Sequence, residues 1–95
     1  MTIDILKTEL EKTVNDFASA GFGSVAPAML AKLDELSALA GDLNMKEGKR
    51  LIVNLSSAIK DKKEEKSRIE SCNVRLEALD FYVKKLSAHT NIEDL

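Results

Sequence analysis

The chain of 95 residues is long enough for one small domain and too short for two, and its net charge of -2 is near zero and indicates no particular partner. Its residues are 44% hydrophobic and 32% charged, with 4 glycines and 1 proline, which is typical of a folded helical protein rather than a disordered one. The single cysteine excludes an internal disulfide, so the composition indicates no oxidising compartment.

The N-terminal residues contain no basic region followed by a long apolar stretch, so we expect no secretory signal. The longest uncharged stretch runs from Phe17 to Ala31, and glycines and a proline interrupt it. A membrane-spanning helix needs about 20 predominantly apolar residues, so we expect no membrane span. The cytoplasm is the compartment that these observations favour.

The first predicted helix covers Ile3 to Ala18, because its apolar residues recur at intervals of three and four. The sequence Gly21-Phe22-Gly23 should end it in a turn. Phe22 has two interpretations, an exposed anchor for a protein partner or a loop residue folded back onto the core. We favour the core position, because large apolar side chains are usually buried.

The second predicted helix covers Ser24 to Ala40, with Pro27 in its first turn, where a missing N–H group is tolerated. Gly41 should stop this helix, and Asn44 with Glu47 resembles a capping box that begins the next one. The apolar face of this helix consists of Met29, Leu33, Leu36, Ala40 and Leu43.

The third predicted helix begins near Met45, and a stretch with no apolar side chain, Lys60 to Arg68, follows it. Two arrangements fit this stretch. One long helix runs from Met45 to about Ala88, or the chain turns near Lys62 to Lys66 and starts a fourth helix. The apolar face of the third helix consists of Leu51, Ile52, Leu55, Ala58 and Ile59.

The last predicted helix has apolar residues at alternating steps of three and four, the spacing of a bundle seam. Ser67 and Glu70 form a capping box in front of it, which favours the turn over the continuous helix. We therefore predict an all-α, antiparallel bundle of four helices in one domain, with residues 89–95 as a flexible tail. The seam residues are Ile69, Cys72, Leu76, Leu79, Val83 and Leu86.

The sequence offers little for catalysis. Cys72 occupies a seam position, so we expect a buried thiol rather than a nucleophile. His89 is the single histidine and has no second ligand near it, so we predict no metal site. We expect a non-catalytic protein that uses no cofactor.

The predicted function is protein binding or self-association, in a module of the inhibitor, immunity, chaperone or adaptor type. Phe81 lies about 160° from the mean direction of the last seam, so one bundle core cannot cover both sides of that helix. We predict a homodimer, because symmetric dimers are the commonest way to cover such a surface. The candidate contact residues are Phe81, Tyr82 and Phe22.

An alternative function is accessory nucleic-acid binding through the segment Lys46 to Arg68, which holds eight basic and four acidic residues. No aromatic residue is interleaved there for base stacking, so we favour a protein partner over a nucleic acid. The candidate nucleic-acid contacts are Lys49, Arg50, Lys62, Lys63 and Lys66.

Overall fold

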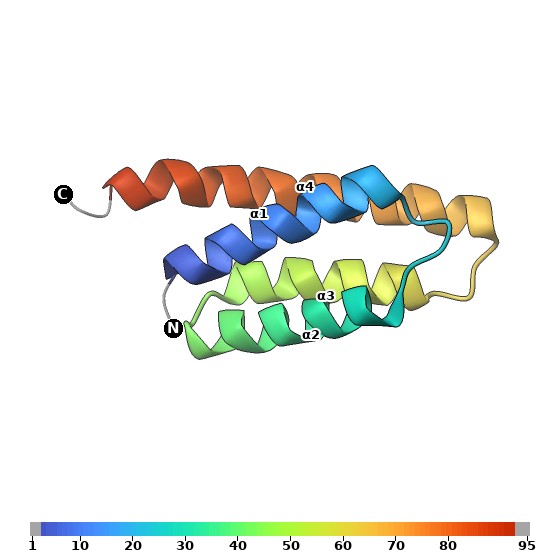
Figure 1. Ribbon diagram of the computed structural model, residues 1–95, viewed down its shortest axis with the longest axis horizontal. Coiled ribbons are helices and arrows are strands. Elements are labelled where there is room, and N and C mark those ends of the chain that lie inside the picture. Colours follow the sequence, from blue (N-terminus) through green and yellow to red (C-terminus); the bar gives the residue numbers. More distant parts are fainter. Residues whose placement is uncertain (1–2, 93–95) are drawn as a thin grey trace.

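Four helices form an antiparallel bundle in which each helix packs against two neighbours (Figure 1). The computed structural model describes residues 3–92, with side chains described as far as residue 86. The helices are α1 (Ile3–Ala20), α2 (Pro27–Asp42), α3 (Lys46–Lys60) and α4 (Glu65–Ile92). The predicted four-helix, all-α fold is thereby confirmed, and the single long helix from Met45 to Ala88 is wrong.

The core lies along the bundle axis and comes mainly from the predicted seams, with Phe22 added from the loop after α1. The predicted seam residues Met29, Leu43, Ile69 and Leu76 are only partly buried at its edge. Within each helix the buried apolar residues recur mostly at intervals of three or four, so they lie on one side of the helix. α2 and α3 make the most extensive contact of the four helix pairs, and α1 and α2 the least. The buried apolar side chains are Leu6, Leu10, Val14, Phe17, Phe22, Leu33, Leu36, Ala40, Ile52, Leu55, Ala58, Ile59, Cys72, Leu79 and Val83.

Two helix ends follow from the local backbone. Gly21 has φ +76 and its N–H group donates to the carbonyl of Phe17, so the glycine ends α1 as predicted. The end of α2 differs from the prediction, because Gly41 lies inside the helix and Asn44 takes the left-handed conformation, with φ 60. Met45 N–H donates to the carbonyl of Ala40 at 2.8 Å, which completes a Schellman motif.

The predicted starts of α2 and α4 and the predicted cap of α3 were wrong in detail, whereas α3 begins at Lys46, next to the predicted Met45. α2 begins at Pro27 rather than at Ser24, and α3 begins after Met45 with no side-chain cap, so Asn44 and Glu47 form no capping box. Ser67 lies inside α4, which begins at Glu65, so no capping box precedes that helix either.

The turn between α3 and α4 has a different cause from the one predicted. Asp61 has extended backbone angles at the end of α3, and its carboxylate accepts a hydrogen bond from the backbone N–H of Lys63 at 3.2 Å. Such local hydrogen bonds favour turns over helix. At its other end α4 runs to Ile92, past residue 89 where the flexible tail was expected to begin, and residues 93–95 lie outside the described residues.

Candidate protein-contact surface

The outward side of α4 carries a second row of apolar residues that the bundle core does not cover. Val74, Ala78 and Phe81 follow one another at steps of four and three, so they lie along one stripe of the helix. Val74 is 58% exposed and Phe81 is 66% exposed. The exposure of Phe81 agrees with its predicted position opposite the seam, whereas Val74 and Ala78 were not identified from the sequence.

A groove of about 580 Å³ lies beside this stripe, between α3 and α4. Leu51 from α3 and Tyr82 from α4 are half-buried in it, and Phe81 stands at its edge. We call Leu51, Val74, Ala78, Phe81 and Tyr82 the α3–α4 apolar surface. The groove is lined by Glu47, Arg50, Leu51, Ala78, Phe81, Tyr82, Lys85 and Leu86.

Tyr82 is held in the groove by its packing against Gly48, in the first turn of α3. A Cβ atom at Gly48 would lie 2.9 Å from the hydroxyl of Tyr82, so only glycine admits the ring at this distance. Burial raises the pKa of the Tyr82 hydroxyl, and a hydrogen bond with the backbone of Gly48 partly opposes this shift. This contact joins α3 to α4 and fixes the floor of the groove.

The rim of the groove carries charges of both signs. Arg50 donates from Nε and Nη2 to the two carboxylate oxygens of Glu47, at 2.8 and 2.7 Å. This bidentate contact lowers the pKa of the Glu47 carboxyl. The ammonium group of Lys85 lies 5.7 Å from the centroid of the Phe81 ring, which is within cation–π range. An apolar surface with a mixed polar rim is typical of protein-contact sites.

Phe22 does not belong to this surface. Its side chain is buried in the core and stacks on Phe17 with a centroid distance of 5.0 Å, as the favoured interpretation expected. Arg68 holds the loop in place by donating from Nη2 to the carbonyl of Phe22 at 2.9 Å. Phe22 is therefore not available as an anchor for a partner in this structure.

The five candidate nucleic-acid contacts are divided between the two ends of α3. Lys49 and Arg50 lie near its first turn, where Lys49 packs toward Gly41 of α2 and Arg50 faces the α4 side. Lys62 and Lys63 lie in the turn after α3, and Lys66 lies in the first turn of α4. The structure thus forms no continuous basic stripe from these five residues.

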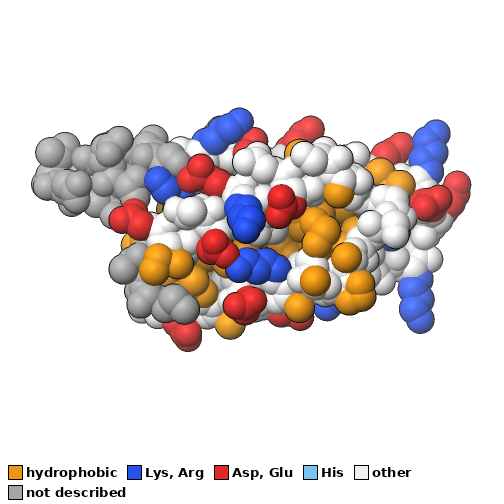
Figure 2. Space-filling view, in the orientation of Figure 1, with side chains coloured by type: hydrophobic (Ala, Val, Ile, Leu, Met, Phe, Trp, Pro, Cys, Tyr) orange, Lys and Arg blue, Asp and Glu red, His pale blue; other side chains and the backbone are white. Residues whose placement is uncertain are grey.

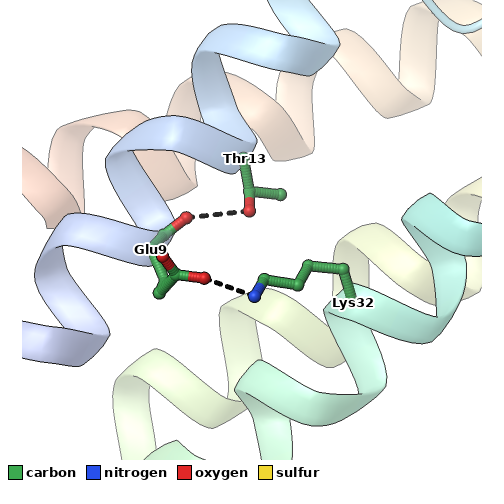
Figure 3. A network of polar contacts seen from close by, with 3 residues as sticks. All are labelled: Glu9, Thr13 and Lys32. Atoms are coloured by element: carbon green, nitrogen blue, oxygen red, sulfur yellow. Dashed lines mark hydrogen bonds and ion pairs between the residues drawn. The ribbon is translucent and has the colours of Figure 1, made fainter.

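A second, smaller hollow of about 260 Å³ lies between α1 and α2. On the face of the molecule shown in Figure 2, charged side chains of both signs lie between two apolar patches. Lys32 reaches across from α2 to form an ion pair with Glu9 of α1, while the hydroxyl of Thr13 donates to the carbonyl of Glu9 at 2.8 Å (Figure 3). The hydrogen bond within this ion pair lowers the pKa of Glu9 and raises that of Lys32. The pair joins α1 to α2 beside the hollow, which Lys32 helps to line.

Two chemical candidates from the sequence remain, Cys72 and His89. Cys72 is fully buried, as predicted, and burial raises the pKa of its thiol. Among residues 3–86, whose side chains are described, no group of three or more His, Cys, Asp or Glu side chains is placed to hold a metal ion. His89 lies beyond the residues with described side chains. No helix in the same part of the chain is long and apolar enough to cross a membrane.

Comparison of the chain with models of protein families, with curated proteins and with solved structures finds no match in any of the three. Function is therefore inferred from the residues and the geometry of the α3–α4 apolar surface.

Proposed function

We propose that the protein is a non-catalytic helical module that binds proteins through the α3–α4 apolar surface. The observation that carries this proposal is the exposure of Phe81 beside a groove that is itself partly apolar. Burying a phenylalanine side chain completely is worth about 1.5–3 kcal/mol, so a ring that is 66% exposed leaves more than half of that free energy for a partner to recover. Inhibitor, immunity, chaperone and adaptor roles all use such a contact.

The arrangement of the surface also supports binding. Phe81 is exposed, whereas Leu51 and Tyr82 are half-buried in the groove. The surface therefore has a protruding ring that can enter a pocket of a partner and a groove that can accept a side chain from it. Tyr82 is fixed by its contact with Gly48, so part of the groove is already ordered before binding.

The proposal is tested by affinity capture with Phe81→Asp and a matched control, Val53→Asp. Val53 is 42% exposed on α3 and lines a separate hollow toward α2, so its change adds the same charge at a distance from the groove. Immobilised wild-type protein and Val53→Asp should retain the same proteins from a lysate of the source cell, and Phe81→Asp should lose them. Quantitative mass spectrometry measures the retention.

Circular dichroism should show unchanged helical content in both variants, because neither side chain belongs to the buried core. Retention of the same proteins by folded Phe81→Asp would contradict the proposed contact surface. Loss of those proteins by Val53→Asp alone would place the contact on the α2–α3 side instead.

A further inference from the structure

The residues on the outward side of α4 form a stripe with the spacing of a coiled-coil seam, which is a surface suited to packing against another helix. Its positions follow one another at alternating steps of four and three residues, so they keep to one side of the helix over about five turns. The small side chains of Ser71 and Ala78 alternate along it with the larger ones of Val74 and Phe81. A second helix can therefore approach closely between the larger side chains. The stripe consists of Ser67, Ser71, Val74, Ala78, Phe81 and Lys85.

Opposite charges flank this stripe. At about 100° per residue, Glu70, Glu77 and Lys84 lie along one edge, and Arg75 lies along the other, the side toward α3. Lys84 pairs with Asp80 of its own helix at 3.0 Å. The side chains of Glu70, Glu77 and Arg75 are exposed. Glu70 and Arg75 are five residues apart, a spacing at which side chains of one helix do not meet but those of two parallel paired helices do. In the described part of the chain neither has an ion-pair partner.

We propose that the partner on this surface is a second copy of the chain, with the two α4 helices packed in parallel about a two-fold axis. This inference rests on the proposed function and names its partner. Each copy then sets Glu70 against Arg75 of the other copy, and the symmetry makes this pair twice. Val74, Ala78 and Phe81 each face the same residue across the axis.

The opposite orientation leaves Arg75 without an acidic partner. In an antiparallel pair each edge of the stripe faces the same edge of the other copy, so Arg75 meets only Arg68, Arg75 or Tyr82. On the other edge only Lys84 can oppose Glu70 or Glu77, and Lys84 is already paired with Asp80 of its own helix at 3.0 Å. The parallel pair has one unfavourable layer, at Lys85, where two ammonium groups approach. The long side chain of lysine can turn outward into water while its stem stays on the apolar surface.

A charge swap tests this pairing in the full chain. Glu70→Arg and Arg75→Glu should each weaken the dimer by roughly tenfold, because each change turns two attractive contacts into repulsive ones. The double variant Glu70→Arg with Arg75→Glu should restore the wild-type dissociation constant, because opposite charges again face each other. Lys12→Glu on α1 is the control for Arg75→Glu, with the same change of charge, and it should leave the dimer unchanged. Sedimentation equilibrium measures all five proteins.

The outcomes separate the two proposals. Wild-type protein that stays monomeric at tens of micromolar overturns the self-pairing. The proposed function is then tested separately, by whether Phe81→Asp loses the proteins that the wild-type protein captures. A wild-type dimer whose affinity the double variant fails to restore overturns the parallel orientation. Each of these surface charges lies outside the core, so circular dichroism should show every variant folded.

Discussion

The contact between Gly48 and Tyr82 makes a sharp prediction about the stability of the groove. Gly48→Ala would place a Cβ atom 2.9 Å from the hydroxyl, 3.0 Å from Cε2 and 3.1 Å from Cζ of Tyr82. These distances are shorter than ordinary van der Waals contacts, and the aromatic ring is rigid. Either Tyr82 or the start of α3 must therefore move when the methyl group is added.

Two opposing terms set the magnitude. Replacing glycine by alanine inside a helix stabilises it by about 1 kcal/mol, whereas overpacking a close contact costs about 1–3 kcal/mol. We therefore expect Gly48→Ala to lower the free energy of unfolding by about 1 kcal/mol. In the Tyr82→Ala background the clash is absent, so the same change should raise the free energy of unfolding by about 1 kcal/mol.

Urea denaturation of the four proteins in this double-mutant cycle measures the coupling between the two residues. Gly41→Ala is the matched control, since a Cβ atom there would meet only the flexible side chain of Lys49 at 3.4 Å. The change in the free energy of unfolding caused by Gly41→Ala should be the same with and without Tyr82→Ala. Equal stabilisation by Gly48→Ala with and without the Tyr82 ring would refute the close contact.

Three further predictions follow from single residues. Cys72 should react slowly with a thiol reagent in the native protein and rapidly in denaturant; because burial raises its pKa, stability should fall as the pH rises above the unfolded thiol pKa of about 8.5. Two glycines inserted after Glu64 should leave the thermal midpoint nearly unchanged, since they lengthen a surface turn, and a large fall would contradict the turn. Lys32 lowers the pKa of Glu9, so the ion pair stabilises the fold above the unfolded pKa of Glu9, and this stabilisation is lost as the pH falls through the folded pKa. Urea denaturation of Glu9→Gln at several pH values should show no such loss.

The seams were predictable because each helix repeats its apolar residues with the helical period, and burial follows that period. The turn between α3 and α4 was predicted correctly from the wrong cap. The structure makes the turn with Asp61, whose carboxylate accepts from the backbone N–H of Lys63. In the sequence this signal is less conspicuous than Ser67 with Glu70, which has the spacing of a capping box but lies inside α4. Similarly, Asn44 took the left-handed position expected of Gly41, because both residues tolerate that conformation more readily than most.

The candidate surface was predictable only in part. Phe81 was found because it is a large apolar residue opposite a seam, whereas Val74 and Ala78 belong to a weaker pattern that small and polar residues interrupt. The contacts of Tyr82 with Gly48 and of Arg68 with Phe22 join segments far apart in the chain, so local periodicity carries no signal for them. From the sequence, Gly48 appears only as a residue that weakens a helix, but in the structure its missing side chain makes room for the ring of Tyr82.

A dilution series followed by NMR tests most directly whether two copies meet through the outer face of α4. With assigned resonances, concentration-dependent shifts should centre on Val74, Ala78 and Phe81, extend to Glu70 and Arg75, and leave Val53 unchanged. Shifts that are absent, or that centre on Val53 and the α2–α3 side, would contradict pairing through α4.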